Sequence, residues 1–318
     1  MKKLFAALLV LSLLLVSATA LADWPERAIE IIVPANPGGD TDANARALAA
    51  ALTEELGWTV NVTNMNGGSG SMAFDDLLAN PDDGYRFVFY HNGGVTAELL
   101  GLYDFSIAGD FQLVGMPFLD NSNAFLSSSK NTNFNDTASL IAYMKDHPGE
   151  VTFATETGNF THVQALAFED AADVQFKIVD AGTASEKIVA LLDNRLDIIA
   201  TQAGLVRDYL ETGDFICLGI LSDAHLDGAP ELPTFVDAGY DVVMSKFFYL
   251  AAPKGMSAEN VATLNAGLAK VVGNAALNEY GTSALVEVTS MTPDETVAYY
   301  NDQYSFYEQL LRDQGFID

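Results

Sequence analysis

The chain is poor in the residues that build covalent and metal-bound sites. It has 318 residues and one cysteine, Cys217, so it can form no internal disulfide and lacks the cysteine pairs of zinc sites. Because Cys217 stands in the apolar run FICL, we expect a buried side chain and not a nucleophile. The four histidines show no metal-binding spacing, and no G-x-S-x-G motif occurs. The sequence therefore predicts no metal, no cofactor and no enzyme.

Basic residues are also scarce. The chain has 15 Lys and Arg against 43 Asp and Glu, which gives a formal net charge of −28 at pH 7. A nucleic-acid partner requires a basic surface, so this class of partner is excluded. Strong self-repulsion favours a soluble protein that stays monomeric.

Long apolar runs are confined to the first residues, MKKLFAALLVLSLLLVSATALA. A basic start, a short apolar stretch and the small residues of Ala20-Leu21-Ala22 are typical of a signal peptide, here residues 1–22, cleaved after Ala22. The stretch is too short for a membrane anchor, and no cysteine follows it for lipid attachment. We therefore expect a protein that is exported to the periplasm or another extracytoplasmic space.

Behind the signal peptide, short apolar runs alternate with helical patterns. Strands are predicted at residues 29–33, 60–63, 87–90, 112–115, 124–127, 151–154, 176–179, 198–201, 216–221 and 248–251. Helices are predicted at residues 41–55, 71–79, 137–145, 161–172, 184–193, 204–211, 258–272 and 293–314, with Gly57 as the C-terminal cap of the first. This β-α-β-α order predicts an α/β fold with parallel sheets covered by helices on both faces.

Four turns between a strand and a helix carry polar side chains. In PANPGGDTD, two glycines let a ligand approach the backbone, and the free N–H groups of the helix start point toward it. NMNGGSGS lacks the Gly-Lys-Ser/Thr ending of a nucleotide-phosphate loop, and neither turn has dinucleotide glycine spacing. TETGNFTH and DAGT offer hydroxyl, amide and backbone donors. Each turn could equally be an ordinary capped connection.

The first and third turns lie in different halves of the chain and would face each other across a cleft. Ligands of open α/β sheets bind at the carboxyl ends of strands, where these turns lie. The predicted ligand-binding residues are Asn36, Pro37, Gly38, Gly39, Thr41, Asp42, Ser69, Thr157, Gly158, Asn159, Phe160, Thr161, His162, Ala181, Gly182, Thr183 and Gln202.

Several longer segments occur in a characteristic order. They are WPERAIEIIVPANPGGDTDANARALA, NMNGGSGSMAFDDL with PDDGYRFVF, GNFTHVQALAFEDAADVQF, and AGTASEKIVALLDNRLDI with ELPTFVDAG. In this the chain resembles the Bug-type extracytoplasmic solute receptors, the substrate-binding proteins of tripartite tricarboxylate transporters. The resemblance implies a two-lobed fold of the type II periplasmic-binding-protein kind, each lobe a sheet flanked by helices. Residues 23–121 and 246–318 would form lobe I, residues 122–245 lobe II, and the two crossings the hinge.

The resemblance also implies a function. Residues 36–42 and 157–162 would grip a small organic carboxylate with one, two or three carboxyl groups from opposite lobes. The receptor would then deliver this ligand to the permease subunits of a membrane transporter. Two alternatives remain open: a periplasmic sensory receptor for the same ligands and a secreted hydrolase.

Three positions depart from the family pattern. Asn36 adds a polar side chain, Asp40 stands where the family has a small residue, and Asp180-Ala181-Gly182 replaces Tyr-Lys-Gly. Because an ionised carboxylate in the cleft would repel an anion, we expect Asp40 to face solvent or to cap the helix. Asp42 matches the family and is expected to order the loop. These departures leave a monocarboxylate, a zwitterion or an amine-bearing ligand open beside polycarboxylates.

Overall fold

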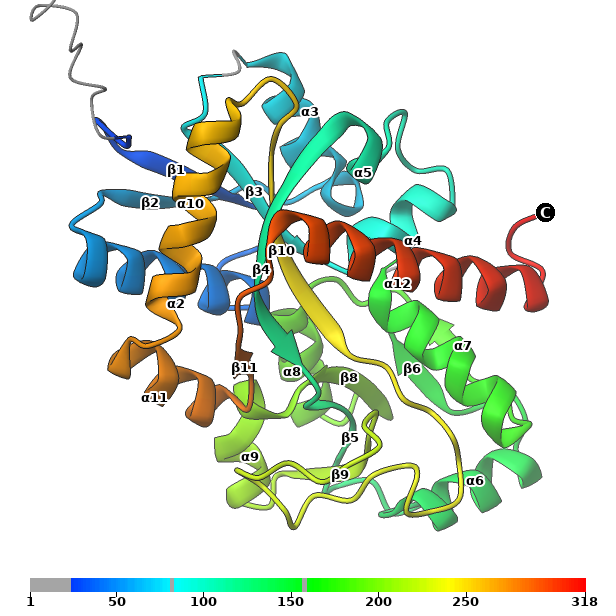
Figure 1. The fold of residues 1–318 in the computed structure, drawn as a ribbon. Coiled ribbons are helices and arrows are strands. Elements are labelled where there is room, and N and C mark those ends of the chain that lie inside the picture. Colours follow the sequence, from blue (N-terminus) through cyan, green and yellow to red (C-terminus); the bar gives the residue numbers. More distant parts are fainter. Residues whose placement is uncertain (1–23, 81–82, 156–158) are drawn as a thin grey trace, which may run out of the picture.

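The computed structural model describes residues 24–80, 83–155 and 159–318, so the predicted signal peptide lies outside it. The chain forms two β-sheets, each flanked by helices, which confirms the predicted two-lobed α/β class (Figure 1). We call the six-stranded sheet with its helices lobe I and the five-stranded sheet with its helices lobe II. Within the described ranges, no helix is both long and apolar enough to cross a bilayer.

The sheet of lobe I has the strand order β11-β4-β10-β3-β1-β2. Strand β1 pairs in parallel with β2 and β3, whereas β10 pairs antiparallel with β3 and β4. The bounds are β1 (Ile29–Val33), β2 (Val60–Asn64), β3 (Arg86–His91), β4 (Phe111–Asp120), β10 (Lys246–Pro253) and β11 (Glu287–Val288).

The sheet of lobe II has the order β7-β6-β8-β5-β9, with β6 parallel to β7 and β8 and β5 antiparallel to β8 and β9. Its strands are β5 (Asn123–Ser128), β6 (Thr152–Ala154), β7 (Lys177–Val179), β8 (Ile198–Gln202) and β9 (Phe215–Ile220). All the predicted strands are present, but the prediction of purely parallel sheets was wrong. The chain enters lobe II at β5 and returns to lobe I at β10, and these two strands run antiparallel to their neighbours. The alternation of strands and helices along the sequence does not reveal where the chain changes from one sheet to the other.

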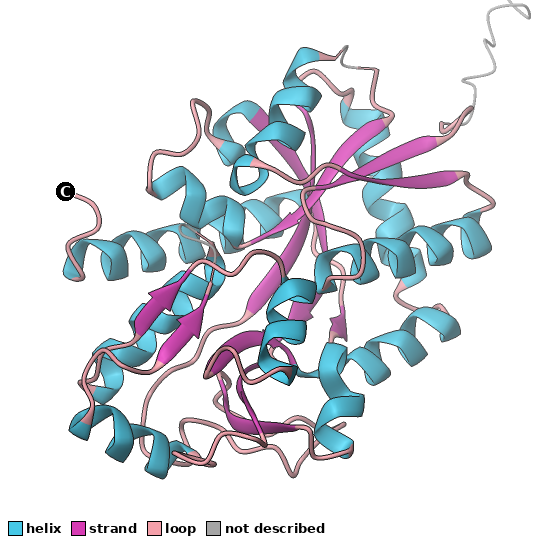
Figure 2. Cartoon of the chain, turned by 180° about the vertical axis from the view of Figure 1, so that it is seen from behind, coloured by secondary structure: helices cyan, strands magenta, loops and turns pink. Residues whose placement is uncertain are grey.

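The helices cover both faces of each sheet (Figure 2). Their bounds are α2 (Asp40–Leu56), α3 (Ser71–Ala79), α4 (Gly93–Leu99), α5 (Ile107–Asp110), α6 (Thr137–Asp146), α7 (Phe160–Ala172), α8 (Ala184–Leu192), α9 (Arg207–Glu211), α10 (Ala258–Val271), α11 (Ala275–Ala284) and α12 (Pro293–Asp313), with 3-10 turns η1 (Gly68–Gly70) and η2 (Ala203–Val206). The predicted helix at 204–211 is split into η2 and α9. The sequence did not predict α4, α5 and α11, because they are short or lack a regular apolar stripe.

Two local predictions are confirmed. Gly57 ends α2 in a left-handed conformation, with φ of 69°, and its N–H binds the carbonyl of Thr53. Cys217 is buried in β9, and burial raises the pKa of its thiol to about 12, as befits a packing residue.

The apolar core is continuous between the lobes on one side of the molecule. A single cluster of buried side chains includes Phe111 and Tyr300 of lobe I together with Phe125 and Phe153 of lobe II. The last helix, α12, joins them, since it contacts β4 and α4 of lobe I and also α7 of lobe II (Figure 1). A second cluster lies between α2, α10, α11 and the other face of the lobe I sheet. The lobes are therefore held together by packing as well as by chain connections.

The chain passes from lobe I to lobe II between β4 and β5 and returns between β9 and β10. The two crossings touch, because the hydroxyl of Ser245 donates a hydrogen bond of 2.5 Å to Asn121 Oδ1. The predicted lobe boundaries lie at these crossings, and their role as a hinge stays a prediction.

The lobes also meet at the end of α11. The side-chain amide of Gln202 in lobe II donates a hydrogen bond of 2.6 Å to the carbonyl of Ala284 in lobe I. Next to it, Leu285 packs onto the apolar cluster of lobe II. A Cβ on Gly204 would lie only 1.9 Å from the carbonyl oxygen of Ala284, so the backbones approach as closely as glycine allows.

We predict that Gly204→Ala lowers the free energy of unfolding by about 1–3 kcal/mol, the usual cost of overpacking, because the new methyl group must displace Ala284. Urea unfolding measures this. Gly273→Ala is the control, since its Cβ would meet nothing closer than 3.7 Å. Equal stability of the two variants would contradict the contact.

Candidate ligand-binding site

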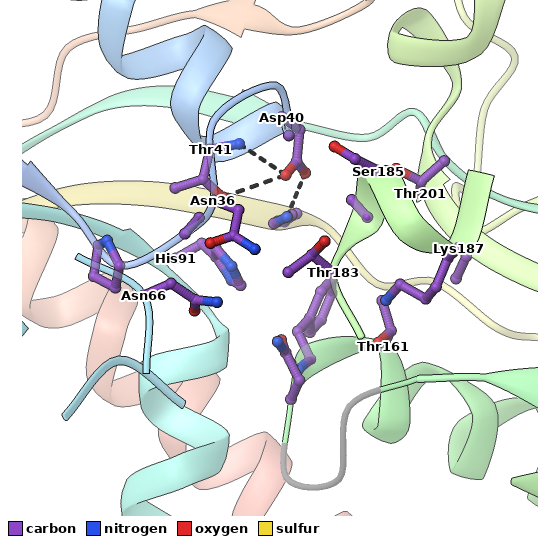
Figure 3. Close-up of a pocket in the computed structure, with 18 of the residues that line it drawn as sticks. Asn36, Asp40, Thr41, Asn66, His91, Thr161, Thr183, Ser185, Lys187 and Thr201 are labelled. Atoms are coloured by element: carbon purple, nitrogen blue, oxygen red, sulfur yellow. Dashed lines mark hydrogen bonds and ion pairs between the residues drawn. The ribbon is translucent and has the colours of Figure 1, made fainter. Parts of the chain in front are cut away.

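A polar pocket lies between the lobes at the carboxyl ends of parallel strands from both sheets. Lobe I contributes the turns after β1 and β2 and the end of β3, and lobe II contributes the starts of α7 and α8 (Figure 3). The polar lining residues are Asn36, Asp40, Thr41, Asn66, Ser69, Tyr90, His91 and Lys246 from lobe I, and Asn123, Asn159, Thr161, Thr183, Ser185, Lys187 and Thr201 from lobe II. The cavity volume is about 70 Å³, which exceeds the roughly 10–15 Å³ that one water molecule needs.

The lobes touch at the mouth of this pocket. A Cβ on Gly39 would lie 3.9 Å from the Cβ of Ala184, and a Cβ on Gly38 would lie 3.7 Å from Ser185 Oγ. The first turn of lobe I thus stands directly against the start of α8 in lobe II. A bound molecule would be enclosed between them.

Several predicted ligand-binding residues come together here. Those in the lining are Asn36, Gly39, Thr41, Ser69, Asn159, Phe160, Thr161 and Thr183. Thr157 and Gly158 lie outside the described residues. That these side chains contact a ligand stays a prediction.

The other predicted site residues lie elsewhere. Pro37 and Gly38 belong to the turn but not to the lining. The ring of His162 packs against Phe316, with 5.4 Å between centroids, and the side-chain amide of Gln202 binds Ala284; neither residue lines the pocket. Ala181 and Gly182 line a separate surface hollow beside α8. These residues do not line the pocket, and that they contact a ligand stays a prediction.

Asp42 holds the first turn in shape. Its carboxylate accepts hydrogen bonds from the backbone of Gly38 at 3.0 Å, from Arg46 Nε at 2.9 Å and from Asn64 Nδ2 at 2.9 Å. These partners come from the turn, from the next turn of α2 and from the end of β2. The expectation that Asp42 orders the loop is confirmed, although Asp42 itself does not line the pocket.

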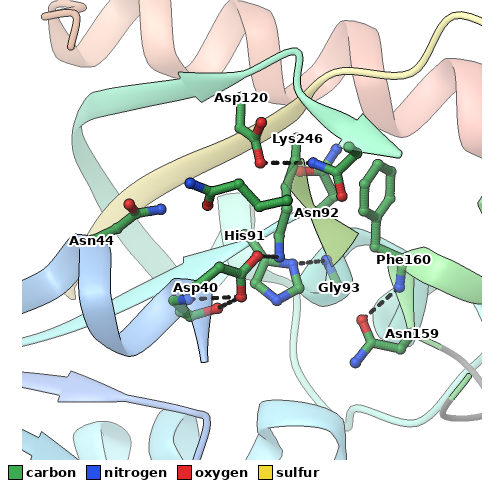
Figure 4. A network of polar contacts seen from close by, with 12 residues as sticks. Asp40, Asn44, His91, Asn92, Gly93, Asp120, Asn159, Phe160 and Lys246 are labelled. Atoms are coloured by element: carbon green, nitrogen blue, oxygen red, sulfur yellow. Dashed lines mark hydrogen bonds and ion pairs between the residues drawn. The ribbon is translucent and has the colours of Figure 1, made fainter. Parts of the chain in front are cut away.

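The expectation for Asp40 was wrong. Its side chain does not face solvent, because Asp40 is only 7% exposed, and Gly39 holds the N-cap position, although Asp40 Oδ1 accepts from the N–H of Thr41 in the first turn. It lines the pocket and forms a buried ion pair with Lys246 Nζ (Figure 4). Burial alone would raise the pKa of Asp40, but the charge and hydrogen bond of Lys246 and the backbone N–H of Thr41 lower it to about 2. The carboxylate is therefore ionised at every physiological pH.

His91, beside this pair, is a neutral donor. Burial, and then the positive charge of Lys246, lower the pKa of His91 well below its ordinary value. Its Nδ1 accepts a hydrogen bond of 2.9 Å from the backbone of Gly93, which leaves the ring proton on Nε2. The ring therefore adds hydrogen-bonding capacity to lobe I without adding charge.

Two lysines were missed by the sequence analysis, which found donors but no cation for this site. Lys187 of α8 and Lys246 of β10 are buried and line the pocket. Lys246 stands next to the apolar run FFYLAA and Lys187 precedes the apolar run IVALL. The signal in the sequence was a lysine at the edge of an apolar segment, because a lysine that is buried there is almost always paired.

Asp120 lies behind the pocket at the first crossing between lobes. It is fully buried and accepts hydrogen bonds from Ser122 N at 2.7 Å, Ser122 Oγ at 2.6 Å and Asn123 Nδ2 at 2.7 Å (Figure 4). Burial raises the pKa of Asp120 to about 7, against the hydrogen bonds from Ser122. Among the described residues, no group of three or more His, Cys, Asp or Glu side chains is placed to hold a metal ion.

Comparison with known proteins identifies the family. The family model described as "Tripartite tricarboxylate transporter family receptor" matches residues 44–316. The chain belongs to this receptor family. The Bug-type resemblance is thereby confirmed, because protein BugT of Bordetella pertussis is 27% identical over 306 residues, which cover 94% of this chain and 93% of BugT.

Solved structures share the receptor's fold. An R. palustris protein determined with adipate has a TM-score of 0.84 at 24% identity, over 91% of this chain and 98% of its own. MatC from Rhodopseudomonas palustris, with bound malate, has a TM-score of 0.83 at 21% identity, over 91% of this chain and 100% of its own. The receptor thus has the two-lobed fold of these solved structures.

We predict a distinctive pH dependence for Asp120→Asn. The pKa of Asp120 is higher in the folded receptor, at about 7, than the ordinary value of 3.8. The protonated carboxyl group therefore adds to the free energy of unfolding below pH ~4, and this contribution is lost as the pH rises to ~7. The loss is at most about 1.4 kcal/mol for each unit by which the pKa is raised on folding. Relative to the variant, the wild type should lose stability between these pH values in urea titrations.

Asp136→Asn is a control for which the opposite pH dependence of stability is expected. Hydrogen bonds from Ser139 lower the pKa of Asp136, the N-cap of α6. The wild type should therefore lose stability relative to this variant only as the pH falls below ~4. A constant difference between wild type and Asp120→Asn from pH 4 to 7 would contradict the assignment for Asp120.

Proposed function

We propose that this receptor captures a small organic carboxylate between its lobes in the periplasm and delivers it to the permease subunits of a tripartite transporter. The observation that carries the proposal is the enclosed polar pocket, in which the starts of three helices, α2, α7 and α8, meet. Helix starts carry partial positive charge and free N–H groups, which suit an anion. Lys187 adds positive charge to the lining, whereas the charge of Lys246 is matched by Asp40.

The size and chemistry of the pocket support the ligand class. A volume of about 70 Å³ suits a molecule of a few heavy atoms and not a nucleotide or a peptide. The lining side chains are mostly hydroxyls and amides, which bind oxygen atoms of any small acid by hydrogen bonds. The R. palustris protein and MatC were solved with adipate and malate, which are themselves small organic acids.

Capture would proceed by closure of the lobes around the ligand. In the closed arrangement the first turn of lobe I stands against Ala184 and Ser185 of α8. A ligand that binds residues of both lobes stabilises this arrangement over an open one. The permease would then recognise the closed, loaded receptor. The family description, a transporter receptor, supports this partner.

The proposal predicts that a small carboxylate stabilises the receptor against heat. Binding to the folded state alone should add about 2.7 kcal/mol at a hundredfold excess of ligand over Kd. A thermal-shift screen over mono-, di- and tricarboxylates, amino acids and aromatic acids measures this. If none of these raises the melting temperature, the proposed ligand class is wrong.

We further predict that Gly39→Val weakens binding at least tenfold while it costs less than about 1 kcal/mol of stability. The backbone at Gly39, with φ of −86° and ψ of 170°, suits valine, so the fold should tolerate it. The valine methyl groups would instead fill the pocket mouth and press on Ala184. Calorimetric titration measures affinity, and Gly39→Ala should have the smaller effect. Equal affinity in wild type and Gly39→Val would remove this turn from the site.

A further inference from the structure

Two backbone N–H groups and one hydroxyl in the first turn of lobe I already bind the chain's own carboxylates. The backbone N–H of Thr41, in the first turn of α2, donates a hydrogen bond of 2.7 Å to Asp40 Oδ1. The hydroxyl of Thr41 lies 3.3 Å from the same oxygen. The backbone N–H of Gly38 donates to Asp42 Oδ2 at 3.0 Å. Groups that would suit a carboxylate of the ligand therefore already hold carboxylates of the protein.

The charge of Lys246 is matched in the same way. Asp40 Oδ2 accepts from Lys246 Nζ, while Asp40 Oδ1 faces Thr41, so both carboxylate oxygens are engaged. The two side chains are about equally buried and sum to zero charge. An amine-bearing ligand would find no unmatched carboxylate in Asp40, and a second ligand carboxylate would find no unmatched cation in Lys246.

What lobe I still offers is uncharged. His91 is a neutral donor, and Asn36 and Asn66 bring side-chain amides to the lining. These groups suit a hydroxyl, keto or amide oxygen. An ionised carboxylate placed there would lose its water without gaining a countercharge, which is costly.

Lobe II is built differently. The starts of α7, with 13 residues, and of α8, with 9 residues, both border the pocket. Parts of these starts are also satisfied internally, since Thr183 donates to Glu186 at 2.8 and 2.9 Å and Phe160 N donates to Asn159 Oδ1 at 2.6 Å. Within the described part of lobe II, the pocket lining nevertheless includes no Asp or Glu, and it includes buried Lys187, the fourth residue of α8. The two ends of the pocket therefore differ in charge: the described lobe II lining has a buried lysine and no carboxylate, whereas the lobe I lining has a matched ion pair.

We infer that Asp40 determines specificity by occupying the place of a ligand carboxylate in lobe I. The receptor then accepts acids with one carboxylate toward lobe II and an uncharged apolar or polar end toward lobe I, and it discriminates against dicarboxylates. This inference rests on the proposed function and narrows it to monocarboxylates.

The test compares acids that match in chain length. Calorimetric titration of the wild-type receptor with butyrate and succinate, 3-hydroxybutyrate and malate, and hexanoate and adipate gives three ratios of Kd. In the pair of acids that binds most tightly, the Kd of the monocarboxylate should be at least tenfold lower than the Kd of the dicarboxylate. Equal or tighter binding of the dicarboxylate overturns the inference and leaves the proposed function standing. Binding of no acid, here or in the wider thermal-shift screen, overturns both.

Two variants test the role of Asp40 itself. Asp40→Asn leaves the charge of Lys246 unmatched, so the ratio of dicarboxylate to monocarboxylate affinity should rise at least tenfold. The double variant Asp40→Asn/Lys246→Met removes both charges and should keep the preference for monocarboxylates. It also keeps the test decisive if the single variant does not fold. A double variant that prefers dicarboxylates, or an unchanged ratio in a folded single variant, overturns the inference.

Asp76→Asn is the control matched in charge. Asp76 pairs with Arg86 on the outside of lobe I and does not line the pocket. The same change in net charge at this position should leave the ratio of affinities unchanged. An equal shift with Asp76→Asn would mean that net charge, and not the position of Asp40, sets the preference.

Discussion

The pocket depends on the chain passing between the two sheets twice, because the crossings bring together residues that are far apart in the sequence. Asp120 ends β4 and Lys246 begins β10, and the two are register partners on neighbouring antiparallel strands. From this place Lys246 reaches Asp40 at the start of α2, and Asn123 reaches the pocket from the first residue of β5. The same strands that connect the lobes thus bring Lys246 and Asn123 to the pocket.

The main effect of the ion pair of Asp40 and Lys246 is on the net charge of the lobe I end of the pocket and not on the stability of the fold. Burying two charges costs desolvation that their attraction roughly repays, so apolar residues of similar size would often serve the fold as well. Removing one partner alone is expensive, typically about 3–5 kcal/mol, because a single buried charge remains. The pair is therefore kept or lost as a unit. Together with neutral His91, it makes the lobe I end of the pocket polar and without net charge.

The sequence predicted the strands and most helices because apolar runs and helical spacing are local properties. Gly57 and Asp42 were predicted correctly for the same reason, since their partners lie within a few residues or in the next strand. Asp40 and Lys246 are 206 residues apart, and no local pattern indicates that they meet. His162 and Gln202 look like site residues in the sequence, but their side chains contact Phe316, beyond the end of α12, and Ala284, at the end of α11. Sequence reasoning therefore missed the directions in which these side chains point, because tertiary packing decides them.

The apolar core that both lobes share limits how the receptor can open. A movement that separates α12 from α7 would uncover aromatic surface, including the rings of Phe160 and Tyr307, whose centroids are 6.1 Å apart. Each Å² of apolar surface exposed in this way costs about 25 cal/mol. A movement that parts α8 from the start of α2 uncovers the polar pocket, although it must also part the end of α11, with Leu285, from lobe II. An opening that keeps α12 packed against α7 would therefore leave this aromatic surface covered.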